Sequence, residues 1–255
     1  MDPTARFSDR VENYIRFRPG YPAGLMDALE ERIGLDASWV VADVGSGTGI
    51  LSAVLLSHGN TVYGVEPNQE MREAAERLLG AHGSFHSVAG SAEDTGLAAE
   101  SVDLVTAGQA FHWFDRDRAH REFARILRPG GYVALVWNDR KPGATPFLES
   151  YERLLVTQAI DYNEVNHRNV DDAQLARFFG AGNYLQVELP NAQHFDWEGL
   201  RGRALSCSYV PGEGHPAHAQ FMGALREIYE AHQTGGEVIF EYDTRLYAGC
   251  LRQDT

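Results

Sequence analysis

One stretch decides the fold of this chain: Trp39-Val40-Val41-Ala42-Asp43-Val44-Gly45-Ser46-Gly47-Thr48-Gly49. It begins as an apolar run typical of a buried strand and ends in glycines at every second position. Glycine permits positive φ, and it lets a ligand approach where a Cβ would collide. Residues 50–58 continue as a helix, whose first amide groups and dipole face the turn. The stretch therefore predicts a strand, a cofactor-binding turn and a helix.

Composition restricts the class of protein. The chain has 255 residues, 44% hydrophobic and 23% charged, which is typical of a soluble globular protein. Its length fits one α/β domain with an insertion. The formal charge of -14 is spread along the chain, and no basic run is present that would follow a phosphate backbone. We therefore expect no nucleic-acid partner.

Targeting and metal signals are absent from the sequence. No apolar run approaches the roughly 20 residues that a membrane span needs, and residues 1–19 lack the apolar centre of a secretory signal. We therefore expect a cytoplasmic protein, with no membrane partner, that is a monomer or a homodimer. Cys207 and Cys250 lie far apart without a metal-ligand spacing. Neither a disulfide framework nor a metal site is expected.

Strands and helices are expected to alternate along the chain. Further strands are predicted over residues 61–65, 85–89, 102–106 and 132–137, and helices over 8–17, 22–33, 68–79 and 115–127. Asn68 and Asp115 are suitable N-caps. The helix after Asn68 is expected to turn four residues toward the sheet, namely Met71, Ala75, Leu78 and Leu79. This alternation predicts a doubly wound, mostly parallel sheet that binds ligands outside the carboxyl ends of its strands.

The pattern changes after Asn138. Helices are predicted over residues 147–160, 171–179 and 217–232, and strands over 184–197, interrupted at Pro190, and 237–247. We expect a single domain, 1–255, on a Rossmann-like seven-stranded sheet with helices on both faces. Its expected parts are N-terminal helices over the cofactor site (8–34), a cofactor-binding core (35–142), helical cap and C-terminal insertions (143–183 and 198–235) and C-terminal strands (184–197 and 236–250).

The glycine spacing distinguishes between cofactors. In Gly45-x-Gly47-x-Gly49 the third glycine falls one residue earlier than in the dinucleotide pattern Gly-x-Gly-x-x-Gly. Asp43, two positions before the first glycine, can hold an ammonium group and would repel a diphosphate. Glu66 ends the second strand, where a carboxylate can accept both ribose hydroxyls, although a solvated strand-end acid is the alternative. Together these features favour a cofactor that carries an amino acid.

These motifs, taken with others, resemble class I S-adenosylmethionine-dependent methyltransferases, and in particular the small-molecule branch that includes proteins like trans-aconitate methyltransferase. The resemblance covers residues 14–138 and rests on six ordered segments: Tyr14-x-x-Phe17-Arg18-Pro19-x-Tyr21-Pro22, Val41 to Gly49, Val65-Glu66-Pro67, Gly90-Ser91-Ala92-Glu93, Gln109-Ala110-Phe111-His112-Trp113-Phe114 and Leu127-Arg128-Pro129-Gly130-Gly131. It implies S-adenosyl-L-methionine as cofactor and a small molecule as methyl acceptor.

The resemblance also implies roles for individual residues. Many relatives carry an aspartate at the position of Ser91, so Glu93 is the expected partner of the adenine amino group. Arg18 is expected to pair with a carboxylate of the cofactor or of the acceptor. The full set of expected cofactor-binding residues is Tyr14, Arg18, Asp43, Gly45, Ser46, Gly47, Gly49, Glu66, Pro67, Met71, Ala92, Glu93 and Gln109.

The acceptor is expected to lie beside the loop that contains His112 and Trp113. His112 is the candidate general base, with simple packing as its alternative. The expected substrate-binding residues are Tyr21, His112, Trp113, Trp137, Asn138 and Tyr209. The sequence thus predicts methyl transfer to an oxygen or nitrogen, with a carboxylic acid as one possible acceptor. Two alternatives remain open at this point: an NAD-dependent oxidoreductase, and a protein that binds S-adenosylmethionine without turnover.

Overall fold

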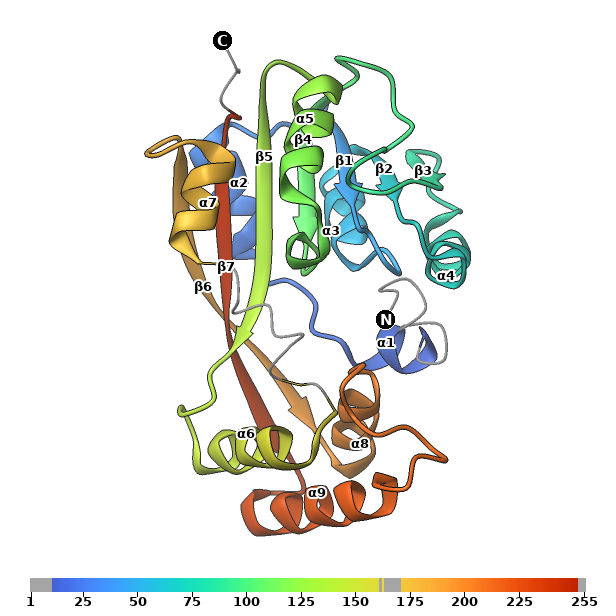
Figure 1. Cartoon of the computed structure of the whole chain (residues 1–255), viewed down its shortest axis with the longest axis vertical. Helices are drawn as coiled ribbons and strands as arrows, with labels where there is room; N and C mark the ends of the chain where they lie inside the picture. The colour runs from blue at the N-terminus through green and yellow to red at the C-terminus, as the bar shows by residue number, and fades with distance from the viewer. Residues whose placement is uncertain (1–10, 161, 163–170, 252–255) are drawn as a thin grey trace.

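The computed structural model describes residues 11–160, 162 and 171–251. Their strands form one seven-stranded sheet in the order β3-β2-β1-β4-β5-β7-β6 (Figure 1). The strands are β1 (Val40–Val44), β2 (Thr61–Val65), β3 (Phe85–Val88), β4 (Val102–Gly108), β5 (Leu127–Arg140), β6 (Tyr184–Phe195) and β7 (Val238–Gly249). The pairs β1–β2, β1–β4, β2–β3 and β4–β5 are parallel, whereas β7 runs antiparallel to both β5 and β6. The predicted seven-stranded, mostly parallel sheet is confirmed.

Helices cover both faces of the sheet (Figure 1). On one face, α2 (Gly24–Ile33) and α3 (Ile50–His58) share a buried cluster with Val41, Leu104 and Val136. On the other face, α5 (Arg116–Ile126) and α7 (Asp172–Phe179) share a second cluster with Val105 and Leu135. Because alternate residues of a strand point to opposite faces, the central strands contribute to both clusters. This accounts for the unbroken apolar runs of β4 and β5.

A second group of helices surrounds the far ends of the longest strands. The strands β5, β6 and β7 continue past the sheet core toward α6 (Pro146–Gln158), α8 (Trp197–Leu205) and α9 (His218–His232), drawn at the bottom of Figure 1. These helices share their own buried cluster, in which Tyr151, Phe221 and Phe240 are fully buried. α1 (Val11–Phe17) lies beside α8. We call this group of helices and strand ends the lower lobe.

Local signals explain most element boundaries. Asn68 accepts a hydrogen bond from the Met71 N–H at 2.9 Å and so begins α4 (Gln69–Leu79). Gly34 ends α2 with a φ of 73°, a conformation that glycine adopts at little cost. Pro190 lies within β6 without breaking it, because β6 is an edge strand whose outer side needs no hydrogen bond.

Two local expectations were wrong. Leu78 is 50% exposed, since it is turned by about 100° from the buried Leu79 on the same helix. β5 begins at Leu127 and ends at Arg140, and is therefore longer than the predicted strand at both ends. The longer strand matters for function because its last residues leave the sheet core and enter the lower lobe. Among the described residues, no helix combines the length and apolar character needed to cross a membrane.

Candidate active site

Two adjoining cavities lie at the carboxyl ends of the parallel strands. The outer cavity, of about 270 Å³, is lined by Gly47, Glu66, Pro67, Met71, Ala92 and Glu93, among others. The inner cavity, of about 140 Å³, is lined by Arg18, Asp43, His112, Arg140, Arg203 and Tyr209, among others. Four residues line both: Gly45, Gly108, Gln109 and Trp113. The two spaces therefore meet at the ends of β1 and β4.

The glycine turn and the end of β2 are joined by hydrogen bonds. The Gly45 N–H donates to the Val65 carbonyl at 2.8 Å, and the Gly47 N–H donates to Glu66 Oε2 at 2.9 Å. Glu66 Oε1 accepts the Asn68 N–H, also at 2.9 Å. Burial raises the pKa of Glu66, although the two N–H donors oppose this shift. The carboxylate is thus held in one orientation at the edge of the outer cavity.

Gly47 and Gly49 have different roles in the turn. Both have positive φ, 56° and 86°. A Cβ at Gly47 would meet no atom within 4 Å and would occupy open space beside the outer cavity. A Cβ at Gly49 would lie 2.5 Å from Leu79 Cδ1, and Gly49 lines neither cavity. The structure therefore places Gly49 in the packing between the turn and α4, away from the position expected of a ligand-binding residue.

Asp43 is a buried acid at the inner cavity. It is 1% exposed, and its two oxygens accept hydrogen bonds from Ser52 Oγ at 2.6 Å and Thr106 Oγ1 at 3.0 Å. Burial raises the pKa of Asp43 to about 6, against the opposing effect of these hydroxyl groups. Thr106 is opposite Asp43 in the parallel register of β1 and β4, so the sheet itself sets this contact.

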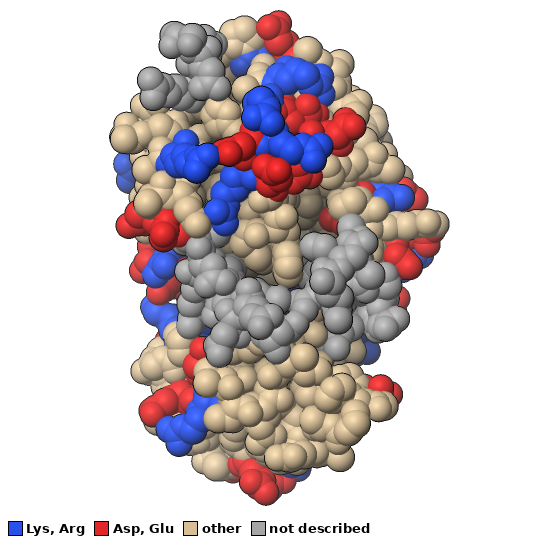
Figure 2. All heavy atoms as spheres, in the orientation of Figure 1, with Lys and Arg blue, Asp and Glu red and all other residues tan. Residues whose placement is uncertain are grey.

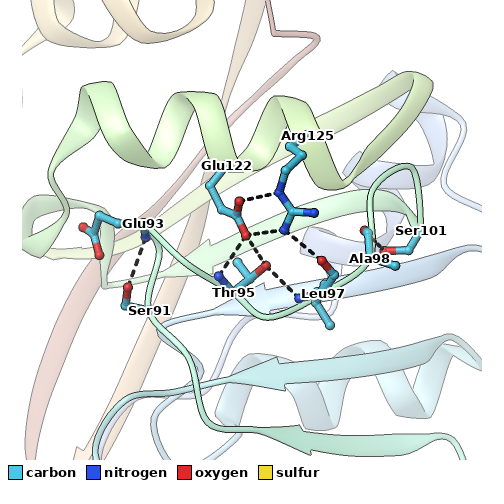
Figure 3. Close-up of polar contacts among 8 residues, drawn as sticks. All are labelled: Ser91, Glu93, Thr95, Leu97, Ala98, Ser101, Glu122 and Arg125. Carbon is cyan, nitrogen blue, oxygen red and sulfur yellow. Dashed lines mark hydrogen bonds and ion pairs between the residues drawn. The ribbon is translucent and has the colours of Figure 1, made fainter.

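A hydrogen-bond network supports the loop on the far side of the outer cavity (Figure 3). Glu122 of α5 accepts hydrogen bonds from the Thr95 N–H and hydroxyl and pairs with Arg125, which also donates to the Leu97 carbonyl. The hydrogen bond from Arg125 lowers the pKa of Glu122 to about 2. This loop carries the cavity-lining residue Glu93, whose side chain accepts the Asp115 N–H at 2.8 Å.

The loop after β4 lies where the two cavities meet. Gln109 has a φ of 59°, and its N–H donates to the Val136 carbonyl at 2.8 Å. A short 3₁₀ helix, η3 (Phe111–Trp113), follows and buries Phe111 in the core. His112 and Trp113 face the cavity side of this turn, with ring centroids 4.9 Å apart. The buried side chain of Phe111 thus holds the rings of His112 and Trp113 beside the inner cavity.

The lower lobe contributes arginines that the sequence interpretation missed. Arg140 and Arg203 are 9% and 5% exposed, and both line the inner cavity together with Tyr162, Tyr209 and Tyr242. Arg140 donates to Glu152 Oε2 at 2.5 Å and to the Tyr162 hydroxyl at 2.7 Å. The sequence could have predicted Arg140, because it lies two residues after the expected site residue Asn138 and alternate residues of a strand point to the same face. Arg203, one helical turn before Cys207, carried no comparable signal.

Most of the expected site residues lie at one of the cavities. The outer cavity has Gly45, Gly47, Glu66, Pro67, Met71, Ala92, Glu93 and Gln109; the inner cavity has Arg18, Tyr21, Asp43, Ser46, His112, Trp113, Asn138 and Tyr209. The side chain of Tyr14 lies outside the described part of the chain. Arg18, expected at the cofactor, lies at the inner cavity, where its Nη2 donates to the Ser206 carbonyl at 3.0 Å.

Trp137 lines neither the inner nor the outer cavity, in contrast to its expected role in substrate binding. It is 4% exposed and contacts Phe111 and Tyr247 in the core cluster beneath α5 and α7. Asn138 points to the opposite face, where it donates to the Gly20 carbonyl at 3.2 Å. The strand alternation therefore allows only one of these two neighbours to reach the inner cavity.

Sequence comparison identifies the domain. Residues 42–135 match the family described as a methyltransferase domain. An uncharacterized methyltransferase of Mycobacterium tuberculosis is 40% identical over 139 residues, which are 54% of each chain. An uncharacterized methyltransferase-like protein of Schizosaccharomyces pombe is 33% identical over 153 residues, which are 58% of this chain and 57% of that protein. The matches thus span little more than half the length of these relatives.

Solved structures extend the similarity to the whole fold. A protein of Anaeromyxobacter dehalogenans that carries the name of a type II methyltransferase is 25% identical, with a TM-score of 0.63 over 93% of this chain and 100% of that chain. Phosphoethanolamine N-methyltransferase 2 of Haemonchus contortus was solved with S-adenosylhomocysteine and is 15% identical to this chain. The two share a fold, with a TM-score of 0.56 over 96% of this chain and 58% of that chain. Residues 42–135 are therefore similar in sequence to methyltransferase domains, and the chain shares its fold with these solved methyltransferases.

Proposed function

We propose that the protein transfers the methyl group of S-adenosyl-L-methionine to an oxygen or nitrogen of a small, negatively charged molecule such as a carboxylic acid. The observation that carries this proposal is the meeting of the two cavities at Gly45, Gly108, Gln109 and Trp113. A cofactor in the outer cavity and an acceptor in the inner cavity would meet at this junction. Such an arrangement suits direct transfer between two bound molecules.

The outer cavity fits the adenosine part of the cofactor. The open space beside Gly47 leaves room for a ligand against the backbone, as a cofactor cradle requires. Each Glu66 oxygen accepts one N–H and keeps a further lone pair for a ribose hydroxyl. Pro67 and Met71 supply an apolar wall for adenine, and Ala92 and Glu93 lie at its proposed edge. These residues are our proposed adenosine site.

The neighbouring part of the inner cavity fits the amino-acid end of the cofactor. Asp43 can face an ammonium group, and Arg18 can pair with a carboxylate in a two-pronged geometry. We assign Gly45, Ser46 and Gln109 to the same end, as the family resemblance implies. Gly49 drops out of the proposed set because its position is taken up by packing against Leu79.

The bound cofactor would supply an electrophilic methyl group for transfer to a lone pair of the acceptor. The protein would align the acceptor, exclude water and balance its charge. His112 and Trp113 line the junction side of the inner cavity, where His112 can receive a proton from a protonated acceptor. An ionised carboxylate needs no such base. Arg203 makes the remote part of the cavity positive and so favours an anionic acceptor.

The assignment is tested in two steps. Calorimetry with S-adenosylhomocysteine should show binding, and NAD should neither bind nor stabilise the protein thermally. A radioactive-methyl assay against small acids, phenols and amines should then give a methylated acid. Binding of S-adenosylhomocysteine with no transfer to any class would favour the non-catalytic alternative. No binding at about 1 mM to folded protein would refute the proposal.

The remaining parts of the proposal rest on the sequence. We place the protein in the cytoplasm as a monomer or homodimer, and we treat residues 1–255 as one functional domain. In this division the core over residues 35–142 binds the cofactor. The insertions over residues 143–183 and 198–235 form the cap that completes the acceptor site, and Arg203 and Tyr209 come from the second of them.

A further inference from the structure

We propose that Arg203 binds an anionic group of the methyl acceptor, and that this group lies at the end of the acceptor remote from the atom that is methylated. The inference rests on the proposed function and goes further, because it identifies one residue as the determinant of acceptor charge and sets a length for the acceptor. It predicts an elongated molecule with two functional ends.

Arg203 is a buried cation without a carboxylate partner among the residues that the structure describes. Its Nη1 contacts Cys207 Sγ at 2.9 Å, and its Nε lies 3.4 Å from the Tyr242 hydroxyl. Its guanidinium also lies over the Phe240 ring, 5.9 Å from the centroid. Arg203 is 5% exposed, and a buried guanidinium is costly to keep without a negative partner. A ligand carboxylate in the inner cavity would remove that cost.

Cys207 offsets the charge of Arg203 only in part. Burial opposes ionisation of the thiol, but Arg203 and Arg18 outweigh it and lower the pKa of Cys207 to about 6. A thiolate is a weaker hydrogen-bond acceptor than a carboxylate, and it contacts a single prong of the guanidinium. A carboxylate can accept both prongs at once. The cavity side of Arg203 is therefore better suited to an external oxyanion.

The other two arginines have different surroundings. Arg140 already pairs with Glu152, and its guanidinium stacks on Tyr151 at 5.1 Å from the ring centroid, so its charge is balanced within the protein. Arg18 lies in the segment before α2, and we assigned it to the carboxylate of the cofactor. Of the three cavity-lining arginines, Arg203 is thus the one whose described contacts include neither a carboxylate nor an assigned ligand.

Strand register sets the separation between the two ends of the inner cavity. Gly108 pairs with Val136, and Arg140, which pairs with Tyr242, lies four residues further along β5. At about 3.3 Å per residue this is an offset of roughly 13 Å along the strand. Arg203 lies level with this far end, because it contacts Phe240 and Tyr242. An acceptor that reaches from the Gln109 junction to Arg203 must therefore be elongated.

The test is a calorimetric titration of the protein saturated with S-adenosylhomocysteine. The probes are straight-chain α,ω-dicarboxylates of about six to twelve carbons, so that the longest can span the offset of roughly 13 Å, and monocarboxylates of the same lengths. We expect dicarboxylates to bind about tenfold more tightly than matched monocarboxylates, with the longer members preferred. Arg203→Met should abolish that difference, and Arg203→Lys should restore it in part, since lysine keeps the charge without the fork.

Arg201→Met is the matched control, because Arg201 lies on the same helix but its side chain is 40% exposed and pairs with Glu213 at the surface. It should leave both affinities within about twofold of the wild type.

Unchanged dicarboxylate binding by Arg203→Met would overturn the inference. Loss of S-adenosylhomocysteine binding by a folded Arg203→Met protein would also overturn it, because Arg203 would then be assigned to the cofactor. Absence of binding by every dicarboxylate at about 10 mM would also overturn it. Failure of wild-type protein to bind S-adenosylhomocysteine would instead refute the proposed function.

Discussion

The carboxylate of Glu66 accepts a hydrogen bond from the backbone N–H of Gly47 at 2.9 Å, so the end of β2 and the glycine turn after β1 hold each other in place. Two motifs that lie 19 residues apart in sequence therefore form one structural unit. The parallel register that pairs Val44 with Val65 brings them together. A change at Glu66 should affect both the shape of the turn and the groups offered to ribose.

Glu66→Gln should lower the affinity for S-adenosylhomocysteine by about tenfold. The amide oxygen can still accept one N–H, but the NH₂ group would face the other N–H donor and would offer no lone pair to a ribose hydroxyl. Calorimetry at neutral pH measures this loss. Glu73→Gln, at an exposed position of α4, is the control and should bind like the wild type. Equal affinity of the two variants would remove Glu66 from the proposed adenosine site.

Gly47→Ala should separate backbone strain from steric exclusion. The positive φ of Gly47 should cost about 1 kcal/mol of folding free energy for alanine. Its Cβ would also enter the space proposed for the cofactor, so we expect S-adenosylhomocysteine affinity to fall at least about tenfold.

Gly130→Ala provides the matched control for backbone strain. Gly130 has a φ of 81°, its Cβ would meet no atom within 4 Å, and it lines neither cavity. Urea unfolding should show a similar loss of stability for both variants, whereas calorimetry should show a loss of binding only for Gly47→Ala. A parallel loss of binding in both would indicate that the space beside Gly47 is not used by the cofactor.

Cofactor binding should depend on pH through Asp43. The pKa of Asp43 in the ligand-free protein is about 6, because burial favours the neutral acid. A nearby ammonium group favours the carboxylate, so binding should lower this pKa and release a proton. The affinity for S-adenosylhomocysteine should therefore rise as the pH increases through about 6 and level off above it.

Calorimetry in buffers of different ionisation enthalpy measures the released proton directly. Asp43→Asn should bind more weakly at neutral pH and should show neither the rise in affinity nor the proton release near pH 6. The amide oxygen of the introduced asparagine can still accept one hydroxyl hydrogen bond, so the variant keeps part of the contact with Ser52 and Thr106. The same pH dependence in wild type and variant would show that another group titrates.

Glu122 should contribute to stability in a pH-dependent way. Its pKa is lowered from 4.5 to about 2, so the ionised form stabilises the native state above the unfolded-state pKa, and this stability is lost as the pH falls through the folded-state pKa. At neutral pH, Glu122→Gln should cost about 2 kcal/mol, because Thr95 and Arg125 lose a charged partner. The difference from wild type should shrink between pH 4.5 and about 2.

Urea unfolding at several pH values measures this difference. Glu149→Gln is the control, since Glu149 also pairs with an arginine on its own helix but is 67% exposed. That variant should change stability by less than about 0.5 kcal/mol at any pH. A cost at Glu122 that does not change with pH would show that the Glu122 charge is not what stabilises the loop in Figure 3.

The charges on the protein surface differ from those in the inner cavity. On the face shown in Figure 2, acidic and basic side chains are mixed around the upper part of the molecule. Asp117 of α5 and Arg177 of α7 form an exposed ion pair. The net charge of -14 makes the exterior acidic on average. An anionic acceptor would therefore be recognised by the buried guanidinium of Arg203 rather than attracted by a basic surface.

Local signals in the sequence were enough to predict the elements around the outer cavity. The apolar run before the glycine turn, the N-caps at Asn68 and Asp115, and the acid at Glu66 all act over a few residues, so their structural consequences are visible without tertiary information. The expected positions of Leu78 and Trp137 were wrong for a related reason. Each lies next to a residue that points the other way, and only packing shows which neighbour faces the core or the cavity.

By itself, the sequence determined the parallel sheet, the glycine turn and the cofactor class, because those features are encoded in contiguous segments. Tertiary structure alone decided which charged residues line the inner cavity. Arg140, Arg203 and Tyr242 come from β5, α8 and β7, and they meet only because the antiparallel register of β5 and β7 continues into the lower lobe. The residue pattern of one segment cannot predict this contact, since the contact depends on how far each of the strands extends beyond the sheet core.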